Sequence, residues 1–279
     1  MAASSFPTRR SVVPVRWSAI AAIVRRDYHI TRSYRLAFGL DLFFGVANLL
    51  LYYFISRTFG AAGGASLDGA PSYFAFAVAG IVVIVVVQAA STALAMRIRE
   101  EQLTGTLEAL VVQPITSVEL CLGLAGFPFV FAFFRAVVYI ALAAAFLGVS
   151  VGHADWPGIA LVLLTAGAAL TSLGIALGGV VLVLKKGDVL ASIAIFVLGL
   201  LGGALFSISV LPGWLQPVAD VVPTRFALDG LRSALYEGSG WGSDVLILVL
   251  FAAITFPVAV WIFDRALRFA ERTGSLAQY

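Results

Sequence analysis

Four long stretches of this sequence contain no charged side chain, and this feature constrains the fold more than any other. Residues 69–96, 156–184, 189–219 and 245–263 lack Asp, Glu, Lys and Arg. A helix needs roughly 20 mostly apolar residues to cross a bilayer, because the hydrocarbon core is about 30 Å thick and each residue adds about 1.5 Å. The chain is only 12% charged, whereas soluble domains are about 25% charged. These stretches therefore predict membrane crossings.

Two further stretches are apolar apart from one charge each. Residues 36–56 contain Asp41, and residues 120–154 contain Arg135. The sequence thus predicts an all-α integral membrane protein with six transmembrane helices, expected at 38–56, 73–96, 119–148, 158–184, 189–208 and 243–263. We expect one membrane domain over residues 38–264, flanked by an amino-terminal tail with an interfacial helix (1–37) and a carboxy-terminal tail (265–279).

Basic residues are distributed unequally between the two sides of the predicted spans. Lys and Arg close to span ends are retained in the cytoplasm. One side holds only Arg57, Arg225 and Arg232. The other holds Arg9, Arg10, Arg16, Arg25, Arg26, Arg32, Arg35, Arg97, Arg99, Lys185, Lys186, Arg265, Arg268 and Arg272. Both termini are therefore expected in the cytoplasm.

The segment before the first span mixes apolar side chains with arginines. Over residues 16–35 this pattern favours a basic amphipathic helix lying on the inner membrane surface. A disordered basic tail is the alternative. Because Pro14, Arg16 and Trp17 interrupt the place where an apolar signal segment would lie, no cleaved export signal is expected.

The connection between the second and third spans has a helical pattern of its own. Its apolar residues recur at helical spacing and predict a short amphipathic helix, formed by Leu103, Leu107, Leu110 and Val111. The helix should end near Gln113, because the residue before Pro114 disfavours the helical conformation. Thr116 and Glu119 have the spacing of a capping box at the start of the third span. A helix joined rigidly to two spans suits the transmission of motion from a soluble motor, and a solvated interfacial loop is the alternative.

The connection between the fifth and sixth spans is apolar but rich in proline and glycine. Non-helical backbone at membrane depth survives only where protein or a water-filled cavity covers it. We therefore expect short re-entrant helices over residues 209–236 that dip into the outer leaflet. The spacing of Arg225, Asp229 and Arg232 places opposite charges on one helical face.

These two connections carry the motifs of a known family. The first contains Arg99-Glu100, Gly105-Thr106-Leu107-Glu108 and Pro114, and the second contains Leu205-Phe206, Leu211-Pro212, Trp214-Leu215, Pro223, Leu228-Asp229 and Leu231-Arg232. In this order they resemble the ABC-2-type permease family, whose members export drugs, antibiotics, lipo-oligosaccharides and surface polysaccharides. Val222 departs from the pattern, since many relatives have asparagine there.

The resemblance implies roles for both groups of residues. The first connection is implied to be a coupling helix that docks on a nucleotide-binding subunit, through Glu100, Glu101, Gly105, Thr106, Leu107, Glu108 and Pro114. The second is implied to form paired re-entrant helices that shape an extracellular gate, with Phe206, Leu211, Pro212, Trp214, Pro223, Arg225, Asp229 and Arg232.

Family resemblance also implies a cofactor that this chain does not hold. The sequence contains no G-x-x-x-x-G-K-[ST], the loop that cradles nucleotide phosphates. ATP and Mg²⁺ are therefore expected on a separate ABC ATPase subunit, and the chain is a transport subunit and not itself an enzyme. The working assembly is expected to pair two permeases, as a homodimer or related heterodimer, in the bacterial plasma membrane, with an amphipathic or lipid-like substrate and no nucleic-acid partner.

One arginine lies inside a predicted span. A central arginine costs at least about 2.5 kcal/mol to insert, so such residues usually face a bundle interior or a water-filled path. Arg135 either contacts an anionic substrate group or makes a structural hydrogen bond to a neighbouring span through Gln88. Asp41 is expected near the inner end of its span, where a headgroup-level or interface role is favoured over a role in transport. The two histidines, His29 and His153, flank opposite sides of the membrane, so no metal site is expected.

Two other functional classes compete with the exporter. A secondary transporter driven by an ion gradient tends to place acidic residues near the midplane, whereas the acidic residues here cluster in loops and at span ends. A membrane-embedded enzyme needs a cluster of His, Asp or Glu side chains, and the sequence suggests none.

Overall fold

The computed structural model describes residues 15–33, 35–59, 70–113, 115–184 and 187–273, and in these ranges the regular structure is entirely helical. The elements in chain order are α1 (Trp17–Ser33), α2 (Arg35–Phe59), α3 (Tyr73–Val87), the π-helix η1 (Gln88–Thr92), α4 (Ala93–Leu103), α5 (Thr106–Val112), α6 (Ser117–Phe146), α7 (Trp156–Leu184), α8 (Gly187–Gly202), the 3₁₀ turn η2 (Ile208–Val210), α9 (Gln216–Ala219), α10 (Pro223–Arg232), the π-helix η3 (Ser233–Glu237) and α11 (Gly242–Thr273).

Five helices are long and apolar enough to cross a membrane. They cover Gly39–Thr58, Tyr73–Leu103, Ser117–Phe146, Trp156–Leu184 and Gly242–Ala270. Each coincides with a predicted span, and together they support an integral membrane protein.

The remaining predicted span, 189–208, is shorter than expected. It corresponds to α8, which has 16 residues and is about 24 Å long at 1.5 Å per residue, less than the hydrocarbon thickness. The helix ends at Gly202 because Gly203 adopts the left-handed conformation, with φ of 75°, a common way for a helix to stop. A sixth crossing therefore remains a prediction.

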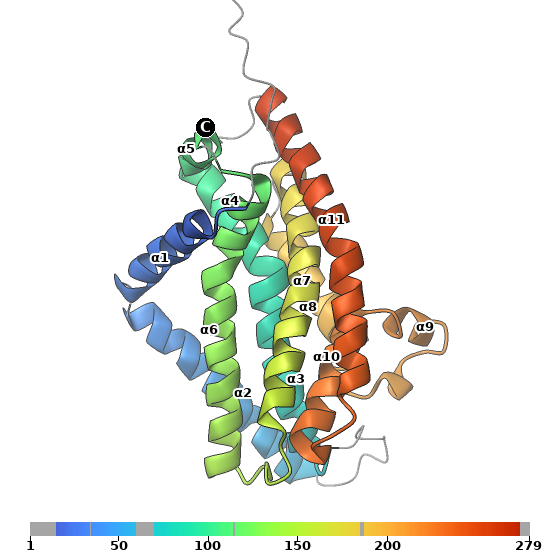
Figure 1. Cartoon of the computed structure of the whole chain (residues 1–279). Helices are drawn as coiled ribbons and strands as arrows, with labels where there is room; N and C mark the ends of the chain where they lie inside the picture. The colour runs from blue at the N-terminus through green and yellow to red at the C-terminus, as the bar shows by residue number, and fades with distance from the viewer. Residues whose placement is uncertain (1–14, 34, 60–69, 114, 185–186, 274–279) are drawn as a thin grey trace, which may run out of the picture.

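Helix α7 lies at the centre of the packing, with α11 along its side (Figure 1). Small residues bring its backbone close to neighbouring helices. A Cβ added at Gly174 would lie 2.3 Å from the carbonyl oxygen of Ala90 in η1, and one at Gly179 would lie 3.1 Å from the Cα of Phe263 in α11. These glycines of α7 therefore allow close helix packing.

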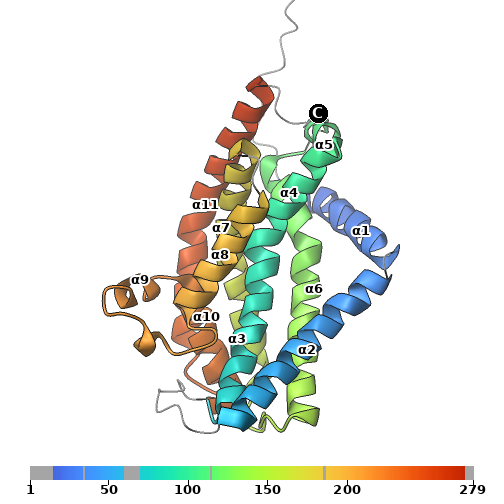
Figure 2. The ribbon, with the colours of Figure 1, turned by 180° about the vertical axis from the view of Figure 1, so that it is seen from behind.

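Successive connections between the long helices lie at opposite ends of the bundle. The α4–α5 connection and the last turns of α11 share the upper end in Figure 1, and the α6–α7 connection and the start of α11 share the lower end. This alternation is what the predicted topology requires. Helices α1 and α2 form a V at one side of the bundle, which both views show (Figure 2).

Candidate coupling elbow and outer segment

A sharp turn separates α4 from α5, and we call residues 100–106 the elbow. Gly105 adopts φ of 72°, and a Cβ added there would meet nothing within 4 Å. The left-handed backbone, and not crowding, therefore favours glycine at this position. The prediction of one helix running from Leu103 to Val111 is wrong, because the turn at Gly105 divides it. Its predicted end near Gln113 is confirmed, since Gln113 caps α5.

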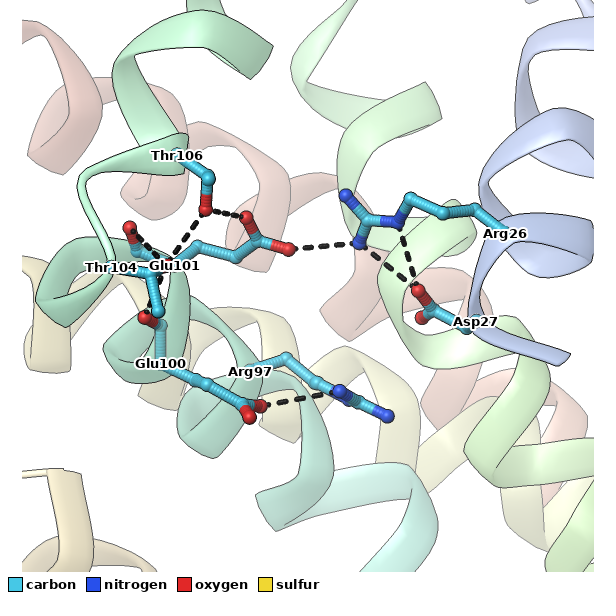
Figure 3. Close-up of polar contacts among 7 residues, drawn as sticks. All are labelled: Arg26, Asp27, Arg97, Glu100, Glu101, Thr104 and Thr106. Atoms are coloured by element: carbon cyan, nitrogen blue, oxygen red, sulfur yellow. Dashed lines mark hydrogen bonds and ion pairs between the residues drawn. The ribbon is translucent and has the colours of Figure 1, made fainter. Parts of the chain in front are cut away.

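Short polar contacts close the elbow (Figure 3). The hydroxyl of Thr104 donates to the carbonyl oxygen of Glu100 at 2.9 Å, and the hydroxyl of Thr106 donates to the Glu101 carboxylate. Arg97 pairs with Glu100 at 3.2 Å. Glu100, Glu101 and Thr106, which the resemblance assigned to coupling, thus all take part in contacts around the turn.

The elbow is also tied to α1, a contact that the sequence did not reveal. Arg26 Nη2 lies 2.8 Å from Glu101 Oε1 and 3.0 Å from Asp27 Oδ1 (Figure 3). Partial burial would lower the pKa of Arg26, but the carboxylates of Glu101 and Asp27 outweigh it and raise the pKa. Asp27 is fully buried. A carboxylate in the middle of a basic helix was the available signal, because a buried charge requires a partner.

A second contact ties the start of α1 to the start of α6. The predicted capping box is present: Thr116 accepts from the backbone of Glu119, and the Glu119 carboxylate accepts from the backbone N–H of Thr116 at 2.7 Å. The same carboxylate, fully buried, also accepts from the backbone N–H of Arg16 at 2.6 Å. Helix α1 therefore rests against α6, and Ile23 fills the space left by Gly123.

The surface around the elbow is apolar in part. Leu103 is 58% exposed and Val112 is 84% exposed. The predicted coupling residues Leu107 and Glu108 belong to α5, but their side chains lie outside the described residues, as does the whole of Pro114. Docking through this surface stays a prediction.

The outer segment, residues 203–241, forms η2, α9, α10 and η3. The ion pairs predicted from spacing are present: Arg225 Nε lies 3.5 Å from Asp229 Oδ2, and Arg232 Nη1 lies 3.9 Å from Asp229 Oδ1. Arg225 also pairs with Asp220. The dip of this segment into the outer leaflet stays a prediction.

Arg232 has a further role that the sequence did not indicate. Its side chain is only 2% exposed, it donates to the carbonyl oxygen of Gly203 at 2.9 Å, and its guanidinium carbon lies 3.7 Å from the centre of the Phe76 ring. Arg232 therefore joins α10 to α3 and to the end of α8.

The other residues predicted for the gate divide into two groups. Phe206 and Leu211 pack in a small apolar cluster with Ala219, and Pro223 is buried in the first turn of α10. Pro212 and Trp214 are exposed on the loop before α9. The structure thus separates residues that support the segment from residues at its surface, and their role in gating stays a prediction.

Arg135 pairs with the single acidic residue of the first predicted span. Its Nη1 atom lies 2.7 Å from Oδ2 of Asp41 in α2. Gln88, proposed as its partner, is exposed on η1. The predicted pairing with Gln88 is wrong, because α2 crosses beside α6 and brings Asp41 to Arg135. The expected headgroup-level or interface role of Asp41 stays a prediction. A single acidic and a single basic charge in two otherwise apolar spans was the signal for this pair.

Comparison of the sequence with models of known protein families gives a match. The sequence model of the ABC-2 type transporter family matches residues 19–236, which include the elbow and most of the outer segment. No curated protein matches the chain. The family match covers well over half of the sequence and agrees with the apolar spanning helices. The chain is therefore a membrane permease that belongs to the ABC-2 type transporter family.

Proposed function

We propose that this chain is the transmembrane permease subunit of an ATP-binding-cassette exporter. A separate ATPase subunit binds ATP and Mg²⁺ and supplies the force, since the sequence has no nucleotide-binding loop of its own. Membership of the ABC-2 type transporter family supports this assignment. The elbow between α4 and α5 is the observation that carries it.

The position and surface of the elbow suit a docking site for a soluble partner. The helical stretch Tyr73–Leu103 has 31 residues, about 46 Å at 1.5 Å per residue, and exceeds the roughly 30 Å hydrocarbon core. The stretch is therefore long enough for the elbow at its end to lie beyond the lipid tails. Exposed Leu103 in the elbow and exposed Val112 at the end of α5 give this surface the apolar character typical of the centre of a protein interface.

The assembly follows from the same proposal. Two permeases, identical or related, pair in the bacterial plasma membrane with two ATPase subunits, and both termini of each permease face the cytoplasm. The elbow and the end of α11 lie at one end of the bundle (Figure 1), which supports this orientation.

The walls of the described helices favour an amphipathic or lipid-like cargo, such as a drug, a lipid or a lipid-linked glycan. Open apolar grooves of about 480 Å³ and 350 Å³ lie between α6, α7 and α11 and between α7, α8 and α11. Grooves of this kind suit an apolar tail better than a small hydrated ion.

Association with an ATPase is the direct test. The full chain is co-expressed with a candidate ABC ATPase from the same genome, and the amount of ATPase that co-purifies is measured. Leu103→Asp should weaken the complex about tenfold, because burying one unpaired charge easily costs about 1.4 kcal/mol. Val210→Asp, an equally exposed apolar position in η2, is the matched control and should have no effect.

Two results would contradict the proposal. One is an ATPase complex that is equally stable with Leu103→Asp and with wild type. The other is uptake or release of substrate by proteoliposomes that contain the chain alone, driven by a proton or sodium gradient. The second result would establish a secondary transporter.

A further inference from the structure

The ion pair between α2 and α6 is unequally buried. Arg135 and Asp41 lie within the spanning stretches Ser117–Phe146 and Gly39–Thr58, and their closest side-chain atoms are 2.7 Å apart. The side chain of Arg135 is 15% exposed, whereas that of Asp41 is 45% exposed. Asp41 therefore covers the arginine from the open side of the contact.

Arg135 is held in place by its own helix as well as by Asp41. Phe131 and Tyr139 lie one turn before and one turn after it on α6, and each ring centre is 5.7 Å from the guanidinium carbon. Aromatic faces attract a guanidinium at this range. The orientation of Arg135 therefore does not depend on Asp41 alone.

Two hydrogen-bond donors beside the pair have no acceptor in the part of the chain that the structure describes. They are Nε of Arg135 and the hydroxyl of Tyr139, both buried. A buried polar group without a partner costs about 1–3 kcal/mol. Gly45 of α2 lies directly over the hydroxyl, since a Cβ there would be 1.6 Å from the Tyr139 oxygen. An acceptor with several oxygens would satisfy donors that the single carboxylate of Asp41 leaves unpaired.

We propose that Arg135 and Tyr139 bind the anionic headgroup of an amphipathic ligand, and that Asp41 occupies this site as an internal competitor when the ligand is absent. The inference rests on the proposed function, in which the chain moves an amphipathic substrate. The beginning of α2 stands away from α6 in both views (Figures 1 and 2), and Asp41 makes the contact between the two helices. Exposed Phe43 and Phe44 on α2 provide an apolar surface for the tail beside the site.

If Asp41 competes with the ligand, substitutions of Asp41 and of Arg135 should change the ligand affinity in opposite directions. In Asp41→Asn the arginine keeps its charge but loses its counter-ion, a costly state inside a membrane that a bound anion relieves. The affinity for an anionic amphiphile should therefore rise about tenfold, within the usual range of coupling between two sites. In Arg135→Gln the affinity should fall at least about tenfold, because charge-assisted hydrogen bonds are the strong ones. An ion pair with only a structural role predicts no gain for Asp41→Asn.

The experiment measures equilibrium binding of radiolabelled dodecyl phosphate to the full chain in phosphatidylcholine discs. Wild type, Asp41→Asn, Arg135→Gln and Tyr139→Phe are compared, and the last should bind a few-fold more weakly. Arg57→Gln is the matched control: it removes an arginine of α2 whose described contacts are to Tyr53. Dodecyltrimethylammonium, with the same tail and the opposite charge, should not compete with the probe.

A second set of discs that also contain phosphatidylglycerol identifies the source of the natural ligand. Loss of probe binding there indicates that bilayer lipids reach the site, and unchanged binding indicates a free amphiphile; both support the site. Binding of the probe by wild type, Asp41→Asn and Arg135→Gln with equal affinity would overturn it, as would weaker binding by Asp41→Asn. If Arg135→Gln fails to fold, the sign of the Asp41→Asn effect decides. The assay contains no ATPase, so this result is independent of ATPase docking.

Discussion

Replacement of Gly80 by alanine tests the close contact between α3 and the start of the outer segment. Gly80 lies in α3 against the backbone of Ala204, which follows the left-handed Gly203. A Cβ at Gly80 would be 1.8 Å from the carbonyl oxygen of Ala204 and 2.7 Å from its carbonyl carbon. Both are backbone atoms, so no side-chain rotation relieves the overlap.

The expected cost follows from this geometry. Overpacking a buried contact costs typically about 1–3 kcal/mol, and a backbone neighbour places Gly80→Ala at or above the upper end. Alanine returns about 1 kcal/mol through its higher helix propensity. The net loss should be about 2 kcal/mol or more, which lowers the melting temperature by about 4–8 °C for a chain of this size.

Thermal melting of the detergent-solubilised protein, followed by size-exclusion chromatography with fluorescence detection, measures this loss. The matched control is Gly199→Ala in α8, where the nearest atom to the added Cβ is the Ile84 side chain at 4.0 Å. This variant should melt at the wild-type temperature or slightly above. If Gly80→Ala melts with the control, the close approach of Ala204 to α3 is not present in the protein.

Two further substitutions test the inner end of the bundle. Gly105→Ala should reduce the amount of substrate moved per ATP hydrolysed several-fold, because a left-handed alanine costs about 1–2 kcal/mol. Gly105→Asn should retain more coupling, since asparagine tolerates this conformation. Equal coupling in both variants would contradict the role of the turn. Glu119→Ala should destabilise the chain by about 2 kcal/mol through loss of hydrogen bonds to its charged carboxylate, which a lower melting temperature would show. The neighbouring substitution Val118→Ala should lower the melting temperature less. An equal loss in both variants would refute this account.

Features that depend on local sequence were predictable. Apolar runs with at most one charge located the five spanning helices because the length and apolarity of a span are fixed by the bilayer, and the capping box at Thr116 depends on residues within one turn. The break in the helix at Gly105 was not predicted, because the apolar spacing continues across it. Only the backbone conformation distinguishes a turn from a helix there.

Contacts between distant segments were harder to predict. Arg135 and Asp41 are 94 positions apart, and Arg26 and Glu101 are 75 apart, so their pairing depends on how α1 and α2 lie against the bundle. Periodicity within one segment contains no information on that arrangement. The burial of Arg232 against Phe76 was not predicted for the same reason, since the sequence spacing indicated only its ion pair with Asp229.

The two anchor points of α1 have a mechanical consequence. Arg26 joins α1 to the elbow before α5, and Arg16 joins the start of α1 to the carboxylate at the head of α6, just after α5. Helix α5 is thus braced at both ends by one rod, so a load applied to it is shared with α1. Helix α1 is followed in the chain by α2, the helix that carries Asp41, so the load path from α5 runs toward the pair of Asp41 and Arg135.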